Sequence, residues 1–133
     1  MLLTDAFLAV KAEFVDGRLN VQGGILGTMY VPPPVMGGLA NARTGRVDLV
    51  TLVRTGPSDH QKPHRLTIEF IDADGNKQLV VEDTIVFDQP AEGSGCWVSP
   101  MMLANVKPGE VAFIVSVDGA GKPVRIPVQV RVQ

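Results

Sequence analysis

Few side chains in this 133-residue chain have the types and spacing that metal binding or catalysis requires. The two histidines, His60 and His64, are four residues apart, and Asp59 precedes the first of them. Imidazole and carboxylate groups are ligands that Zn²⁺ accepts, so the three residues form a zinc-like set. Pro63 lies between the histidines and prevents the helix that would align them. We therefore interpret the segment as a polar loop without a metal.

Two glycine-containing turns match ligand-binding loops only in part. Residues 72–76 (Asp-Ala-Asp-Gly-Asn) suggest a calcium loop, but an EF-hand places glycine sixth and is flanked by helices. Residues 119–122 (Gly-Ala-Gly-Lys) resemble the end of a phosphate-binding loop, but Pro123 stands where Ser or Thr is required. Both segments are predicted to be hairpin turns, and a loose calcium site at residues 72–76 is the alternative.

Two single residues could also carry chemistry. Cys96 is the only cysteine, so the chain has no intramolecular disulfide, and a nucleophilic role would need a histidine positioned beside it. We interpret Cys96 as a free thiol. Asp83 points into the core if the strand alternation around it holds, but a bulge at residues 82–83 that turns it outward is favoured. We predict no catalytic residues, no metal, no cofactor and no enzymatic activity.

Two further groups of residues are candidates for binding. The first is an apolar cluster in the long segment 89–108, which forms either a lid over one end of the fold or a contact surface, since Trp and Met are enriched at interfaces. Its members are Trp97, Met101, Met102 and Leu103. The second group could hold an anionic ligand in loops. Its members are Arg43, His60, Lys62 and Arg65.

Composition restricts the partners. The chain is 45% hydrophobic and 20% charged with a net charge of -2, which is ordinary for a soluble globular protein. A nucleic-acid binder would show a basic excess, so no nucleic-acid partner is expected. No apolar run approaches the ~20 residues that cross a bilayer, so no membrane association is expected. The first residues lack the pattern of a signal peptide. A cytoplasmic location is predicted, with a virus particle as the alternative.

Three Asp-Gly pairs, at residues 16–17, 74–75 and 118–119, lie between runs of apolar and β-branched residues. Such pairs are strong hairpin signals because Gly accepts φ > 0. The pair Gly23-Gly24 indicates a bend where a strand can cross between two sheets. Ser99-Pro100 resembles a helix start and predicts a helical turn over 101–105. The expected strands are 6–15, 18–31 with the bend, 46–54 as a central strand, 65–72, 77–87, 110–117 and 124–132.

These strands predict an all-β fold, a two-sheet antiparallel β-sandwich of immunoglobulin-like or C2-like type with seven or eight strands. A small barrel is the alternative. In 77–87 the predicted inward residues include Leu79, and in 6–15 they include Val10 and Phe14. Pro127 predicts that the last strand is an edge, because proline cannot donate to a ladder. Residues 1–133 are expected to form one domain.

Residues 15–24 (Val-Asp-Gly-Arg-Leu-Asn-Val-Gln-Gly-Gly) resemble the N-terminal hairpin of an uncharacterised family of small bacterial and phage β-sandwich domains. Residues 66–72 before Asp74-Gly75, and 113–119 before the last strand, are also similar to that family. The resemblance covers most of the chain. It implies a β-sandwich, and because the family has no known function it implies no active residues.

The leading functional hypothesis is a non-enzymatic binding or assembly module that acts through loops or an edge strand, because sandwich scaffolds host binding in this way. A protein partner or self-association is expected. One alternative is a virion-associated structural protein of a phage, such as a capsid decoration or tail component. The other is a protein that sequesters a small molecule or nucleotide.

Overall fold

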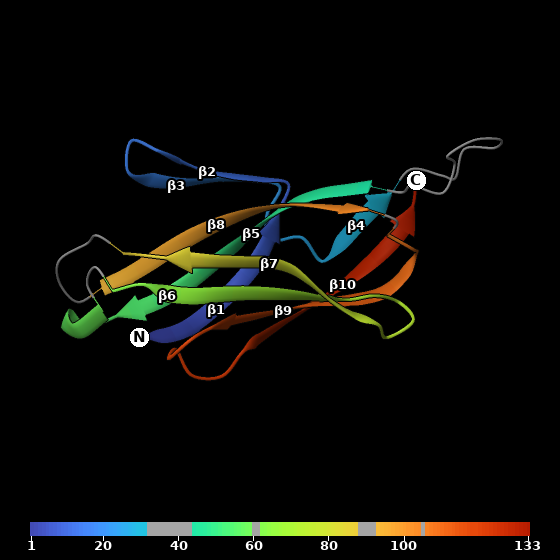
Figure 1. The fold of residues 1–133 in the computed structure, drawn as a ribbon. Coiled ribbons are helices and arrows are strands. Elements are labelled where there is room, and N and C mark those ends of the chain that lie inside the picture. Colours follow the sequence, from blue (N-terminus) through green and yellow to red (C-terminus); the bar gives the residue numbers. More distant parts are fainter. Residues whose placement is uncertain (32–43, 60–61, 88–92, 105) are drawn as a thin grey trace.

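The computed structural model describes residues 1–31, 44–59, 62–87, 93–104 and 106–133. These residues contain ten strands and one 3₁₀ turn (Figure 1). In chain order they are β1 (Leu2–Ala9), β2 (Lys11–Val15), β3 (Arg18–Gln22), β4 (Thr28–Val31), β5 (Thr44–Thr55), η1 (Pro57–Asp59), β6 (His64–Ile71), β7 (Lys77–Ile85), β8 (Gly93–Ala104), β9 (Gly109–Val117) and β10 (Val124–Val132). The prediction of an all-β sandwich is confirmed, with more strands than the seven or eight expected.

The strands form two main sheets that pack face to face. The five-stranded sheet has the order β4-β10-β9-β6-β7, and the three-stranded sheet has the order β1-β5-β8. Neighbours are antiparallel except for β4 and β10, which run parallel. The expectation that residues 46–54 form a central strand is confirmed, because β5 pairs with β1 on one side and β8 on the other.

The main core lies between these two sheets. Alternate side chains of β6, β9 and β10 point inward, as the period-2 pattern of the sequence predicts, and meet alternate side chains of β5. Phe113 in β9 and Leu49 in β5 are both fully buried. The ring of Phe113 packs against that of Phe70 in β6, with 5.2 Å between centroids. This packing holds the two sheets together and so positions their edge strands, β7 and β8 among them.

The β2–β3 hairpin forms a third layer, on the outer face of the three-stranded sheet (Figure 1). Its turn has φ of 51° at Asp16 and 75° at Gly17, as a tight Asp-Gly hairpin requires. Ala12 of the hairpin and Val50 of β5 are buried together in a second, smaller core. This layer explains why β5 is apolar on both faces.

The prediction of one continuous strand over 6–15 is wrong. The chain bends at Val10, whose N–H donates to the carbonyl of Gly23, and passes from β1 into the hairpin. Val10 is 59% exposed and Phe14 is 53% exposed, so neither side chain is buried in a core as predicted. A bend interrupts the alternation on which the prediction rested.

The bend predicted at Gly23-Gly24 is confirmed. The chain leaves the hairpin there and enters the five-stranded sheet as β4. A Cβ atom at position 23 would lie 2.5 Å from Val10 Cγ2, and one at position 24 would lie 2.7 Å from Val21 Cγ1. The close approach of these side chains therefore requires glycine at both positions.

Strand β7 departs from the predicted alternation. Its register with β6 shifts by one residue, so that Ile68 faces Val81 but Glu69 faces Leu79, and Val80 forms a bulge. Leu79 is consequently 50% exposed rather than inward. Asp83 is exposed, as favoured, although the bulge lies at Val80 and not at residues 82–83.

The helical turn predicted over 101–105 is wrong, because residues Gly93–Ala104 form the 12-residue strand β8. Ser99-Pro100 is not a helix start. Pro100 faces Asp48 across the pair with β5, and in the part of the chain that the structure describes β5 is the one strand that pairs with β8. Proline is tolerated on such an edge strand, where its missing donor breaks no ladder bond.

The prediction that the last strand is an edge is also wrong. Strand β10 lies between β9 and β4. Strand β4 covers only the end of β10 from Gln129 onward, so Pro127 precedes this pairing and costs no bond there. Among the described residues, no helix has the length and hydrophobicity needed to cross a bilayer.

Candidate functional site

A cleft opens between the two sheets on the side where β7 and β8 are the outermost strands. Strand β7 is the last strand of the five-stranded sheet, and β8 is the last strand of the three-stranded sheet. The cleft has a volume of about 550 Å³, and we call it the edge cleft. It is lined by Phe70, Asp72, Asn76, Lys77, Gln78, Val80, Met102, Leu103 and Ala104.

The apolar part of the edge cleft is the end of the main core. Phe70 and Leu103 belong to that core and are 7% and 5% exposed. Phe70 points inward because it alternates with Ile68 along β6, and Leu103 alternates in the same way along β8. The bulge residue Val80 packs partly buried against the same core. A side chain that entered here would extend an existing hydrophobic cluster.

Met102 is the most exposed of the apolar residues at the edge cleft. Its side chain is 73% exposed, because it alternates with the buried Met101 and Leu103 and so points to the other face of β8. A methionine side chain is flexible and polarisable, and can adapt to surfaces of different shapes. A single exposed apolar side chain is ordinary on a protein surface. Met102 gains interest from its place in an edge strand, whose open backbone groups can pair with another chain.

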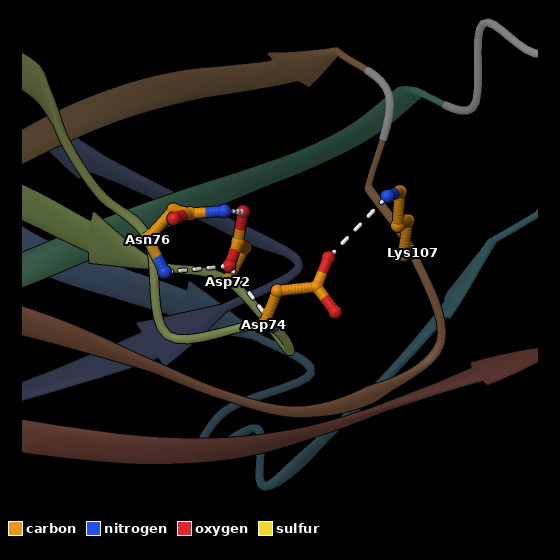
Figure 2. A network of polar contacts seen from close by, with 4 residues as sticks. All are labelled: Asp72, Asp74, Asn76 and Lys107. Carbon is orange, nitrogen blue, oxygen red and sulfur yellow. Dashed lines mark hydrogen bonds and ion pairs between the residues drawn. The ribbon is translucent and has the colours of Figure 1, made fainter.

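The polar wall of the edge cleft is the turn between β6 and β7 (Figure 2). One carboxylate oxygen of Asp72 accepts hydrogen bonds from the backbone N–H groups of Asp74 (2.9 Å) and Asn76 (2.8 Å). The Asn76 side-chain amide donates to the other oxygen at 3.4 Å. These bonds, that of the Asn76 N–H above all, lower the pKa of Asp72 below its usual value.

This turn answers the calcium alternative. The Asp72 carboxylate is engaged by its own loop, and Asp74 forms an ion pair with Lys107 at 3.3 Å (Figure 2). Within the described ranges, no three His, Cys, Asp or Glu side chains are grouped as a metal site would need. The two carboxylates of the turn are thus engaged, Asp72 by N–H groups of the turn and Asp74 by Lys107.

Lys77 in the edge cleft and Arg46, which is paired with the cleft residue Met102, have no ion-pair partner among the described residues. Lys77 lines the cleft and makes no ion pair with any described residue. Arg46 in β5 faces Met102 across the strand pair, is exposed, and also makes no ion pair in the described part of the chain. Asp74 is paired with Lys107 and Asp72 accepts hydrogen bonds from its own turn, whereas these two cations have no such partner among the described residues.

The structure divides the predicted apolar cluster. Met101 and Leu103 are buried, at 5% exposure each, and Trp97 is partly buried against the main core. The prediction that the four residues form one loop surface is therefore wrong, because strand alternation sends them to opposite faces. Met102 points outward and, with Leu103, lines the edge cleft.

The predicted anionic-ligand loop is not assembled in the described residues. Arg43 and His60 lie outside them. Lys62 is exposed, and the Arg65 guanidinium is paired with the Glu82 carboxylate across β6 and β7.

The zinc-like set is likewise incomplete. Asp59 Oδ2 accepts from the backbone N–H of Gly56 at 2.8 Å and lies 2.9 Å from the amino group of Met1. These contacts, led by the Gly56 N–H, lower the pKa of Asp59. His64 Nε2 is buried and has no hydrogen-bond partner among the described residues. Asp59 is thus a capping group for η1 in this structure.

Asp83 and Cys96 show no arrangement for catalysis. Asp83 is exposed, and its Oδ1 accepts from the backbone N–H of Thr84 at 2.8 Å, a local bond at the edge of β7. Cys96 lies half-buried against the smaller core beneath the hairpin. Burial raises the pKa of the Cys96 thiol, which opposes formation of the nucleophilic thiolate.

Sequence reasoning named Met102 and Leu103 as part of a contact surface and placed Asp72 and Asn76 in a turn, but it did not single out Lys77 or Val80. Lys77 and Val80 gave no signal, because the bulge and the place of β7 in its sheet arise from pairing between distant segments. Pro100 was the available signal. A proline inside an apolar run indicates an edge strand as readily as a helix start.

The chain is similar to a family defined by sequence. A model described as a family of unknown function (DUF6941) matches residues 4–131. The chain belongs to this family. The resemblance to an uncharacterised family is confirmed, while an origin in bacteria or phages stays a prediction.

Two other comparisons add little. No curated protein matches the sequence. One similar solved structure is that of the CooA pilin subunit from enterotoxigenic Escherichia coli, at 11% identity over 96% of this chain and 97% of that chain, with a TM-score of 0.38. A likeness at that TM-score does not establish a shared fold or function.

Proposed function

We propose that this protein is a non-enzymatic binding module that engages a protein partner at the edge cleft. One observation carries the proposal: the last strands of both sheets, β7 and β8, lie beside a cleft that reaches core residues Phe70 and Leu103. Unpaired strand edges and accessible apolar groups are two features that protein partners use in recognition.

The chemistry of the edge cleft supports a binding role. The largest exposed apolar side chain there, Met102, is more exposed than most large apolar residues of the molecule. Of the charged groups that the structure describes near the cleft, Asp74 and Lys107 pair with each other and the Asp72 carboxylate is hydrogen-bonded by its own turn. Lys77 and Arg46 have no ion-pair partner among the described residues and could meet a partner's carboxylates. No step of bond-making chemistry is part of this proposal.

Assembly into a larger structure is a narrower form of the same proposal. A second copy of the chain is one possible protein partner, and a phage virion component would be another form of assembly. The sequestering alternative lacks a gathered set of cations in the described residues, because Arg65 is paired with Glu82. We therefore favour a protein partner over a small anionic ligand.

Site-specific photo-crosslinking tests the proposal. A photoreactive amino acid replaces Met102, and in a matched control it replaces Ile25, which is 77% exposed but lies between β3 and β4. We expect irradiation in cells of the source organism to give one discrete protein adduct from position 102 and none from position 25. Adducts of the same pattern from both positions, or none from position 102, would overturn the proposal.

A further inference from the structure

We propose that the occupant of the edge cleft is an extended protein segment that adds as a strand beside β8, places an apolar side chain in the cleft and carries acidic residues next to it. This inference rests on the proposed function, because it specifies the partner at that same surface.

The backbone of β8 calls for an extended partner. Strand β8 has 12 residues and pairs along its whole length with β5, and no strand of the described residues lies on its other side. An added strand satisfies the unpaired backbone groups of such an edge, which a helix or a globular surface cannot do. Pro100 removes one donor from this edge, so the segment on the Met102 side of Pro100 is where continuous pairing and the cleft coincide.

The other edge strands of the two main sheets are less suited to an added strand. Strand β7 has a bulge at Val80 and the exposed carboxylate of Asp83, and both features interfere with regular pairing. Strand β4 has only four residues. Strand β1 is partly engaged, since Leu3 donates to the carbonyl of Ala120 and the carbonyl of Leu8 accepts from Leu26.

The hollow beside β8 selects for an apolar side chain. In strand addition, main-chain bonds supply affinity and pockets for alternate side chains supply specificity. Phe70, Val80 and Leu103 offer carbon surface that is continuous with the main core. Burial of an aliphatic or aromatic side chain against them would remove apolar surface of both partners from water.

The charges favour acidic neighbours of that side chain. Lys77 in the cleft and Arg46 across from Met102 are free of ion pairs with described residues, whereas Asp72 is bonded by its turn and Asp74 is paired with Lys107. A segment with Asp or Glu beside its apolar residue would pair with the two free cations. A basic segment would gain no free carboxylate here.

The test is selection from a displayed library of random linear peptides on the immobilised full-length protein. We expect enriched peptides to share an apolar residue flanked by Asp or Glu. Synthetic peptides of the enriched sequence should bind at least tenfold more weakly to the Met102→Ser and Lys77→Glu variants. Their binding should also weaken as salt rises.

Matched variants control for charge and for exposure. Lys122→Glu makes the same charge change in the turn before β10, and Ile25→Ser makes the same kind of polar change at an exposed apolar residue. We expect both to bind the peptides as the unaltered protein does. All four altered residues are exposed and lie outside the cores, and a circular-dichroism spectrum of each variant tests that it is folded.

Three results would overturn this inference. They are no enrichment of any peptide, enrichment of basic peptides, or binding of the enriched peptides to the Met102→Ser and Lys77→Glu variants as strong as to the unaltered protein. The two proposals fail separately. A crosslinked partner at position 102 without any enriched peptide would leave the binding function in place and remove the extended segment. Absence of both the crosslink and the peptides would remove both.

Discussion

Asp48 shows how one buried carboxylate joins two layers of this molecule. It lies in β5, is 6% exposed, and its Oδ2 accepts the backbone N–H of Ala12 at 2.7 Å. Ala12 belongs to the hairpin and is itself 6% exposed, so its N–H has no ready access to water. The Asp48 carboxylate therefore fixes the base of the hairpin to the three-stranded sheet.

Replacement of Asp48 should lower the free energy of unfolding. We expect Asp48→Ala to lower the free energy of unfolding by about 1–3 kcal/mol, because the Ala12 N–H is left buried without an acceptor. Asp48→Asn should lose less, since its amide oxygen can still accept that bond. Urea unfolding of both variants measures the difference. Equal stability of Asp48→Ala and the unaltered protein would contradict this role.

Asp59 and Asp72 predict a loss of stability in acid. Hydrogen bonds, chiefly from the Gly56 N–H to Asp59 and from the Asn76 N–H to Asp72, lower both pKa values below the 3.8 of an ordinary aspartate. A carboxyl with a depressed pKa in the folded state stabilises the protein above its unfolded pKa, and this stability is lost as pH falls through the folded pKa. We therefore expect the urea midpoint to fall between about pH 5 and about pH 2.

The Asp72→Asn variant is the control for this pH dependence. It keeps an oxygen that can accept the turn's hydrogen bonds but cannot titrate, so its stability should fall less steeply over the same pH range. Urea titrations at a series of pH values compare the two proteins. A variant with the same acid dependence as the unaltered protein would exclude Asp72 as a source of it.

At the scale of elements, local patterns predicted the hairpins and the core strands. Asp16-Gly17 predicts its turn because the two left-handed residues needed there are chemically specified. The alternation of Leu66, Ile68 and Phe70 predicts that they face the core, because side chains along one strand point alternately to its two faces. These signals need no knowledge of distant segments.

The positions of β8 and β10 in their sheets could not be predicted from the sequence, because they depend on pairing between distant segments. The place of β10 beside β4 depends on a parallel pair formed by residues about a hundred positions apart in the chain. Pro127 and Pro100 carry the same local signal, and only the sheet order makes β8 the edge and β10 an inner strand. The edge cleft could not be predicted because it exists only where the ends of β7 and β8 meet.

Gly95 tests the packing of β8 against the β7 side. A Cβ at this position would lie 2.7 Å from Phe87 Cε1 and 3.0 Å from Val53 Cγ2. We expect Gly95→Ala to cost about 1–3 kcal/mol, because the buried ring of Phe87 must move. Gly27→Ala, with no atom within 4 Å of the added Cβ, is the control and should change stability much less. Thermal or urea unfolding compares them, and equal effects would contradict this packing.

At the scale of the whole molecule, the three layers leave the strand edges exposed on the side of β7 and β8. The hairpin covers the outer face of the three-stranded sheet, and β1 is bonded to neighbouring segments at both of its ends. Strands β7 and β8 end their sheets on the other side, beside the edge cleft. The arrangement of the layers thus concentrates the open backbone edge, the apolar hollow and the unpaired cations in one place.

Amide hydrogen exchange tests the central claim that this place is the binding surface. The exchange of the full-length protein is measured alone and with the protein partner identified by crosslinking at position 102. The account predicts new protection of the backbone at residues 77–80 and 101–104, with β4 unchanged. Protection confined to β4 or to the hairpin, with residues 101–104 exchanging as in the free protein, would contradict it.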